Sequence, residues 1–475
     1  MMKRSTHVGS RARAAALALL GSVTVTALSS AEPASVSSVE RVSSSGASSR
    51  SAPLPARTAL RYDWDYPVID YSGPAVHNDI ARLQARIDRG EVKLEYRPPR
   101  GYLDSLLEAL DIDPSSQTLV HSKTSLQKDV IDPDRPRAIY FNDETYVAWV
   151  QDSDLLEFVT MDSDKGPVFY SMHNVEGGPL HLDREMHRCL TCHDTYSMSG
   201  GGVPRFLFVS TLVATNGEFL VPNLSRDTTD ATPIAQRWGG WYVSGLHGKQ
   251  VHLGNIVAHS AREFVGIEKA RRGNLRTLDG LFDTSPYPRN TSDIVALLVF
   301  EHQAYMHSLI TRLNFKARTL VAREQGAAAA QASWDQFSPK VQRALKAMME
   351  PVVEGMLFVG AAPLTDKVTG TAGFEKWFES RGPHDSRGRS LRKLNLTTRL
   401  FEYPLSYLVY SDGFDGLPDY ARKYIYERLA EVLSGRDTSQ TFSHLSPADR
   451  TAILEILTET KPEFAAVAGA TPTRR

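Results

Sequence analysis

The sequence predicts an α+β protein in which an antiparallel β-rich segment is followed by a mainly helical C-terminal segment. Two observations predict this class. Between residues 117 and 172, short β-branched or aromatic runs alternate with turn-like clusters such as Asp132-Pro133-Asp134. From about residue 291, apolar residues recur three and four positions apart, which is the helical period. The chain has 475 residues, 41% of them apolar, so it is long enough to build a large core.

The first 57 residues are predicted to precede the folded body. Lys3, Arg4, Arg11 and Arg13 stand before an apolar run that ends in small residues at position 31, which is the order of a secretory signal peptide. We therefore expect a signal peptide over residues 1–31 and a disordered Ser/Ala/Pro-rich linker over residues 32–57. The apolar run is too short for a comfortable membrane span. An exported, periplasmic protein with no stable membrane span is expected.

The charge balance argues against a nucleic-acid partner. The chain has 54 basic and 55 acidic residues and a net charge of −1. Removing residues 1–31 takes away four basic residues and no acidic ones, so the remaining chain carries −1 − 4 = −5. No global positive charge is present to attract nucleic acid or an anionic membrane.

Residues 58–290 form the predicted β-rich segment. Apolar spacing predicts short helices over residues 77–92 and 102–110, before the strands of residues 117–172. Further along, residues 205–215 and 217–223 are predicted to pair as strands across a turn at Asn216-Gly217.

Residues 291–475 form the predicted helical segment. The 361–394 stretch, rich in Gly, Arg and Lys, is predicted to be a long exposed loop. Helical spacing occurs over residues 292–313, 333–350, 395–410, 418–434 and 446–459.

Both cysteines of the chain lie in one pentapeptide, Cys189-Leu190-Thr191-Cys192-His193. The C-x-x-C-H pattern is the attachment signal for haem c. Two cysteines three residues apart lie about one helical turn from each other, so both can form thioethers with one porphyrin. The next residue, His193, then reaches the iron as its proximal ligand. With two cysteines placed at random, this spacing followed by His would arise on the order of once in 10,000 chains.

Other uses of the two cysteines stay open. A redox dithiol would sit at a strand-to-helix turn of a βαβ unit, whereas the surroundings here are predicted to be antiparallel. A structural zinc site needs four ligands, and the sequence has no second cysteine pair. Cys189 and Cys192 could also form a disulfide, which export would permit.

The pentapeptide resembles that of the c-type cytochromes, with CLTCH as the haem-binding motif. More loosely, KTSLQKDVIDPDRPRAIYFND, RWGGWYVSGLHGKQVHLGN and RLFEYPLSYLVYSDGFDGLP are similar to segments of large, uncharacterised bacterial exported single-haem proteins. The resemblance implies one covalent haem c on Cys189 and Cys192, with His193 on the iron. It implies no reaction. The chain is also far longer than a small cytochrome c domain of about 100 residues.

One candidate region for the sixth iron ligand is residues 237–255, which hold His247 and His252 among glycines and aromatic residues. We favour His252, because glycines permit close backbone approach and the neighbouring tryptophans suit contact with a flat ring. The alternative for this region is a hairpin loop with exposed histidines.

The second candidate region is the predicted helix over residues 292–313, where His302 and Met306 are four residues apart on one face. The alternative is an internal hydrogen-bond network, since buried polar groups need partners. Met198 is expected not to bind the iron, because it follows His193 by only five residues and is tethered to the proximal side.

The sequence therefore predicts a periplasmic single-haem protein that transfers electrons to an unidentified redox partner. A haem-dependent peroxidase or oxygenase with an open distal site is one alternative. A haem-free binding or assembly protein with a Cys189–Cys192 disulfide is another. No catalytic residue is assigned, because no Ser-His-Asp order, phosphate loop or paired-carboxylate motif rises above chance.

Overall fold

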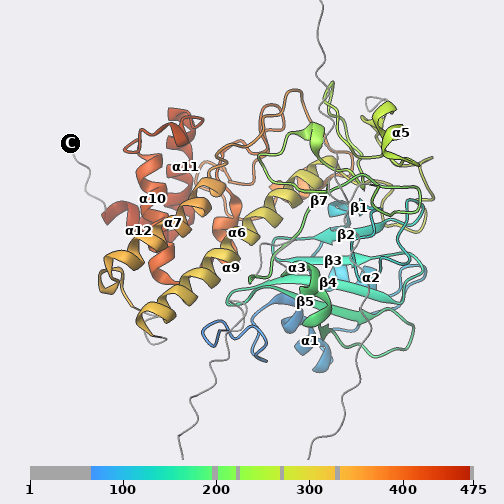
Figure 1. Ribbon diagram of the computed structural model, residues 1–475, viewed down its shortest axis with the longest axis horizontal. Helices are drawn as coiled ribbons and strands as arrows, with labels where there is room; N and C mark the ends of the chain where they lie inside the picture. Colours follow the sequence, from blue (N-terminus) through green and yellow to red (C-terminus); the bar gives the residue numbers. More distant parts are fainter. Residues whose placement is uncertain (1–65, 195–201, 221–224, 268–271, 327–331, 471–475) are drawn as a thin grey trace, which may run out of the picture. The chain divides into compact units, whose positions relative to one another are not determined.

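The computed structural model describes residues 66–194, 202–220, 225–267, 272–326 and 332–470 (Figure 1). The predicted α+β class is confirmed, because an antiparallel sheet lies between residues 118 and 242 and helices dominate from residue 294. The expected signal peptide (1–31) and linker (32–57) lie outside the described residues.

Among the described residues, seven strands form one antiparallel sheet in the order β6-β5-β4-β3-β2-β1-β9. The turn clusters seen in the sequence separate neighbouring strands. In the β2–β3 turn, for example, the side-chain oxygen of Asn142 accepts the N–H groups of Glu144 and Thr145. The strands are β1 (Thr118–Val120), β2 (Arg137–Phe141), β3 (Thr145–Trp149), β4 (Leu155–Asp162), β5 (Gly166–His173), β6 (Asp183–Arg184) and β9 (Trp241–Tyr242).

The two faces of the sheet pack against different parts of the chain, because side chains alternate along each strand. Tyr140, Val147 and Trp149 share a core with the short helices α1 (Asp79–Asp88) and α2 (Leu103–Ala109). The opposite face, which includes Phe141 and Tyr146, shares a core with the C-terminal helices.

The long helix α6 (Ile294–Gln325) joins the sheet to the C-terminal helices (Figure 1). Asp293 caps its N-terminus by accepting the N–H groups of Val295 and Ala296. The helix ends at Gly326, whose φ of 87° favours glycine. It is much longer than the predicted 292–313.

Helices α7 to α12 contact α6 directly or through one another. Helix α7 packs on α6, α10 packs on α7, and α11 and α12 pack on α10 and on each other. Their bounds, with those of the short helices, are α5 (Ala261–Gly266), α7 (Pro339–Met356), α8 (Phe374–Glu379), α9 (Asp412–Asp415), α10 (Asp419–Leu433), α11 (Pro447–Thr460) and α12 (Pro462–Ala470).

The predicted helix over residues 395–410 is wrong. Only a short 3₁₀ turn, Tyr407–Tyr410, forms there. Pro404 explains this difference, because proline removes a helical hydrogen bond and disfavours the α conformation of the residue before it. Upstream, Asn395 closes a turn by accepting the N–H groups of Thr397 and Thr398.

Two other predicted features also differ. The 361–394 stretch is mostly irregular but not uniformly exposed, since Val368, Phe374 and Phe378 are buried in the core. The predicted strand pair around Asn216-Gly217 is reduced to a turn with one bridge, Val213 to Phe219. The strand β7 (Val209–Ser210) pairs instead with β8 (Arg226–Asp227).

Candidate functional site

The pentapeptide forms the last residues of a short helix, α3 (His187–His193), which follows the edge strand β6. The Thr191 hydroxyl donates to the carbonyl of His187 inside this helix. Cys189 is half-buried, Cys192 is exposed, and neither forms a disulfide. The helical conformation puts the two thiols about one turn apart, as expected from their spacing.

Helix α3 is held over β4 and β5 (Figure 1). Leu190 is buried in the core that also contains Tyr140, Val147 and Trp149. Glu185 connects the start of the helix to β5, since it pairs with Arg188 and accepts the hydroxyl hydrogen of Ser171 at 2.6 Å. Further along β5, the ring of Phe169 contacts the His193 imidazole, with ring centroids 4.6 Å apart.

The His193 ring is oriented by a backbone carbonyl. Its Nδ1 lies 2.7 Å from the carbonyl oxygen of Arg205, and the N–H of Arg205 donates back to the His193 carbonyl at 3.1 Å. A carbonyl only accepts, so Nδ1 carries the proton and Nε2 carries the lone pair. Burial, the largest effect, lowers the pKa of His193 to about 4, so the imidazole is neutral near pH 7.

The Cys189 thiol is protonated near pH 7. Burial first, and then the negative charges of Glu157 and Glu185, raise its pKa to about 12. Catalytic dithiols need the opposite, a thiol pKa lowered by a helix N-terminus or a nearby cation. The surroundings of Cys189 therefore disfavour the redox-dithiol interpretation.

These residues fit a covalently attached haem. Cys189 and Cys192 supply two unpaired thiols from one helix, and His193 supplies a neutral imidazole with its Nε2 lone pair available. A histidine that binds a metal commonly donates its other ring N–H to a carbonyl, which fixes the tautomer. Arg205 provides this contact. Sequence reasoning missed it, because a backbone carbonyl leaves no residue-type signal.

His247 and His252 form a buried pair with ring centroids 4.8 Å apart. The interpretation of exposed loop histidines is therefore wrong. Nε2 of His247 accepts the N–H of Asn274, and Nδ1 of His252 accepts the N–H of Gly254. The other two nitrogens carry the protons and are buried without hydrogen-bond partners. The lone pairs needed for metal binding are thus already used inside the loop.

His302 has both ring nitrogens occupied. Nδ1 contacts Asp230 at 2.9 Å and Nε2 contacts the Ser406 hydroxyl at 2.8 Å, while Phe358 stacks on the ring. The contacts follow the order of a catalytic triad. However, His302 and Ser406 are fully buried, so this is the internal network that polar groups in a buried helix require. Met306 is also fully buried, in the apolar core.

The structure does not bring these four candidates to α3. In the described part of the chain, no ring contact or hydrogen bond joins His247, His252, His302 or Met306 to the helix. Met198 lies outside the described residues. No group of three or more His, Cys, Asp or Glu side chains suited to a metal ion occurs within the described ranges.

No described helix is both long enough and apolar enough to cross a membrane. Comparisons of the chain with known protein families, with curated proteins and with solved structures find no match.

Proposed function

We propose that this protein is an exported c-type haem protein that binds one haem covalently through Cys189 and Cys192 and transfers electrons. His193 is the proximal ligand in this proposal. The observation that carries the proposal is the hydrogen bond from His193 Nδ1 to the carbonyl of Arg205. His193 directly follows Cys192, and the thiols of Cys189 and Cys192 are both free on the same helix.

Haem would supply a reversible one-electron couple at the iron. The residues of this chain hold and orient it. Phe169 packs against the imidazole, the carbonyl of Arg205 fixes its tautomer, and burial keeps it neutral and able to donate its lone pair.

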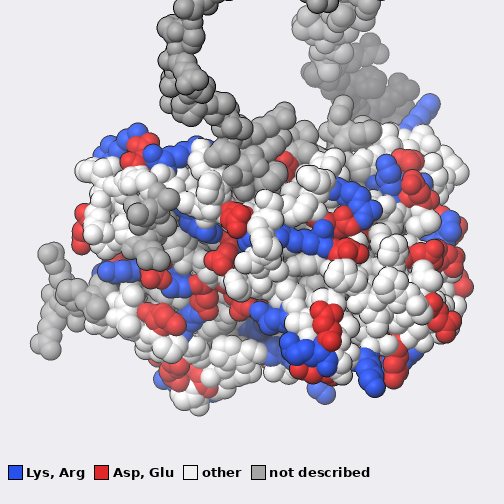
Figure 2. Space-filling model, turned by 90° about the horizontal axis from the view of Figure 1, so that it is seen from below, with Lys and Arg blue, Asp and Glu red and all other residues white. Residues whose placement is uncertain are grey.

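The partner in this proposal is a redox protein. On the face seen in Figure 2, basic and acidic side chains are interspersed with no broad area of one sign. This pattern, together with the net charge of −5 that remains once residues 1–31 are removed, favours a protein partner over nucleic acid.

A haem enzyme with an open distal position is the second candidate. The observation that favours it is the engagement of His252 and His302 in internal hydrogen bonds away from α3. The spin state separates the two functions, because a six-coordinate low-spin iron suits electron transfer and a five-coordinate high-spin iron leaves room for a substrate.

The test is to produce the exported chain together with a cytochrome c maturation system. Wild-type protein should keep haem stain on a denaturing gel, and Cys192→Ala should lose most of it. His193→Ala should change the Soret band. The matched control is His187→Ala, which removes an exposed histidine from the same helix and should leave stain and spectrum unchanged. Wild-type protein without covalent pigment would refute the proposal and favour the haem-free protein.

A further inference from the structure

The sheet face beneath α3 carries a buried polar corner made by Gln127, Arg137 and Glu157. In the sheet register Glu157 lies opposite Ala148 on β3 and Ser171 on β5. Glu157 therefore points to the same face of the sheet as Ser171 and as Phe169, which is two residues from Ser171. The ring of Phe169 contacts the His193 imidazole.

Arg137 and Gln127 both reach the Glu157 carboxylate. Nη1 of Arg137 lies 3.4 Å from Oε2, and the backbone N–H of Gln127 donates to Oε1 at 3.2 Å. The Arg137 and Glu157 side chains are only 13% and 16% exposed. The ion pair links β2 to β4 across β3, where the small Ala148 leaves room.

Three polar atoms of this corner have no partner. Arg137 Nε and both amide atoms of Gln127 are buried without a hydrogen bond. Buried donors and acceptors are nearly always paired, so three orphans in one corner indicate that a further group completes it. Glu157 does not satisfy the Arg137 guanidinium, because its single contact with it is longer than a normal charge-assisted hydrogen bond.

The corner also lies next to the helix that carries the pentapeptide. Glu157 is the cross-strand neighbour of Ser171, the Ser171 hydroxyl donates to Glu185 at 2.6 Å, and Glu185 pairs with Arg188 on α3. The unused donors therefore lie beside the helix that carries both thiols.

A guanidinium and a primary amide N–H together recognise a carboxylate. We propose that Arg137 and Gln127 form a carboxylate-binding site for one propionate of a haem attached to α3. This inference rests on the proposed function and adds to it a second point of attachment, on the sheet.

The test uses the haem-loaded protein. In Gln127→Leu the propionate loses a neutral donor. In the double variant Arg137→Met with Glu157→Gln it loses the guanidinium, and no buried charge is left unpaired. The control is Arg135→Met, which removes a more exposed arginine paired with Asp132.

Two readouts report on the propionate itself. Its bending bands in resonance Raman spectra should shift in both test variants and not in the control. The midpoint potential should also change its pH dependence, with the inflection moving to higher pH, because a carboxylate that loses donors has a higher pKa.

The outcomes are distinct. Covalently loaded test variants with unchanged bands and unchanged inflection overturn this inference and leave the proposed function standing. A wild-type protein without covalent haem overturns both. Gln127→Leu is the safer variant to fold, because replacing an unpartnered buried amide by an apolar group costs little.

Discussion

At the residue scale, hydrogen-bond partners separate the histidines more clearly than burial does. His193 and His252 are both held neutral by a burial-lowered pKa. In His193 the bonded nitrogen is a donor to a carbonyl, so the lone pair of Nε2 is free to bind a metal. In His252 the bonded nitrogen is the acceptor, so the free nitrogen carries the proton. The proposed ligand is therefore distinguished by its tautomer.

We expect that none of the distal-ligand candidates predicted from the sequence binds the iron in the haem-loaded protein. His252→Gln, His302→Gln and Met306→Leu should each leave the reduced spectrum unchanged. His302→Gln should lower the free energy of unfolding by roughly 1–3 kcal/mol, since it removes the histidine partner of Asp230 and Ser406. Visible spectroscopy and urea unfolding measure the two effects.

Loss of a low-spin band in one of these variants would identify that residue as the ligand instead. Met198→Leu belongs in the same series, because the short tether to His193 predicts no change there either. An unchanged spectrum throughout, with a high-spin iron, would favour the haem enzyme over the electron carrier.

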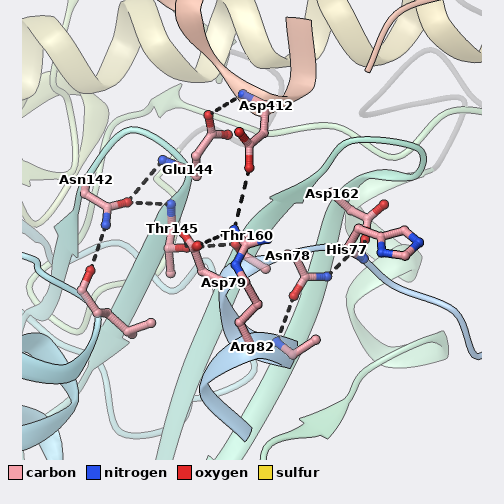
Figure 3. A network of polar contacts seen from close by, with 12 residues as sticks. His77, Asn78, Asp79, Arg82, Asn142, Glu144, Thr145, Thr160, Asp162 and Asp412 are labelled. Atoms are coloured by element: carbon pink, nitrogen blue, oxygen red, sulfur yellow. Dashed lines mark hydrogen bonds and ion pairs between the residues drawn. The ribbon is translucent and has the colours of Figure 1, made fainter. Parts of the chain in front are cut away.

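At the element scale, a polar junction ties α1, the β2–β3 turn and α9 together (Figure 3). Oε1 of Glu144 accepts the N–H of Asp412 at 2.9 Å, while its Oε2 is buried without a partner. Beside it, the Thr145 hydroxyl donates to Asp79, and Arg82 pairs with both Asp79 and Asp412. Burial raises the pKa of Glu144 well above its usual value, with smaller contributions from neighbouring carboxylates.

The stability contribution of Glu144 should decline with rising pH. Its raised folded pKa means that the contribution is complete below the unfolded pKa and is lost as pH rises through the folded pKa. Glu144→Gln keeps the acceptor for Asp412 and cannot ionise. The variant should therefore lose less stability than wild type between pH 5 and pH 8 in urea unfolding. Glu176→Gln, at an exposed position, is the control and should follow wild type. A Glu144→Gln curve parallel to wild type would contradict the assignment.

At the scale of the whole molecule, one core joins the sheet to the C-terminal helices within the compact unit of residues 59–475. Phe300 on α6 shows the connection, because its ring lies 5.2 Å from those of Phe141 and Tyr146 and 5.1 Å from that of Phe208. The sheet face that carries α3 is thus also packed against α6, which is far from the strands along the chain.

Residues 59–290 produced alone should fail to fold. Without α6, the face carrying Phe141 and Tyr146 would be exposed to water, at a cost of about 25 cal/mol for each Å² of apolar surface. Strong dye binding and lost near-UV circular dichroism are the expected signs. A fragment with a cooperative thermal transition would contradict this expectation.

The haem-free protein should lose stability in acid. Burial lowers the pKa of His121, His193 and His307 to about 4 and that of His252 to about 3. Unfolding lets each of them bind a proton, so stability falls as pH drops below the unfolded value of about 6.5. Each group adds at most about 1.4 kcal/mol per pH unit to the slope.

Urea unfolding between pH 7 and pH 4 measures that slope. The matched variant is His121→Gln, in which one of the four groups no longer titrates, so its slope should be shallower than that of wild type. His181→Gln, at an exposed position, should leave the slope unchanged.

Much of the local structure could be predicted from the sequence. The period of apolar residues identified α1, α2, α10 and α11 and the strands β1 to β5, because in each of these elements the residues on the buried face recur at the period of the helix or strand. The pentapeptide likewise located the candidate attachment site, since its spacing involves three residues within a stretch of five. These features depend on contacts close along the chain.

The tertiary structure decided what depends on distant contacts. Residues 395–410 contain many apolar residues, but they form an irregular segment because Pro404 disfavours a helix there. The apolar side chains of this segment are buried in the core shared with the C-terminal helices. The pairing of β9 with β1, the burial of His247 and His252, and the carbonyl partner of His193 have the same origin. Each depends on a group brought near by folding, and a residue's own identity carries no record of which group that will be.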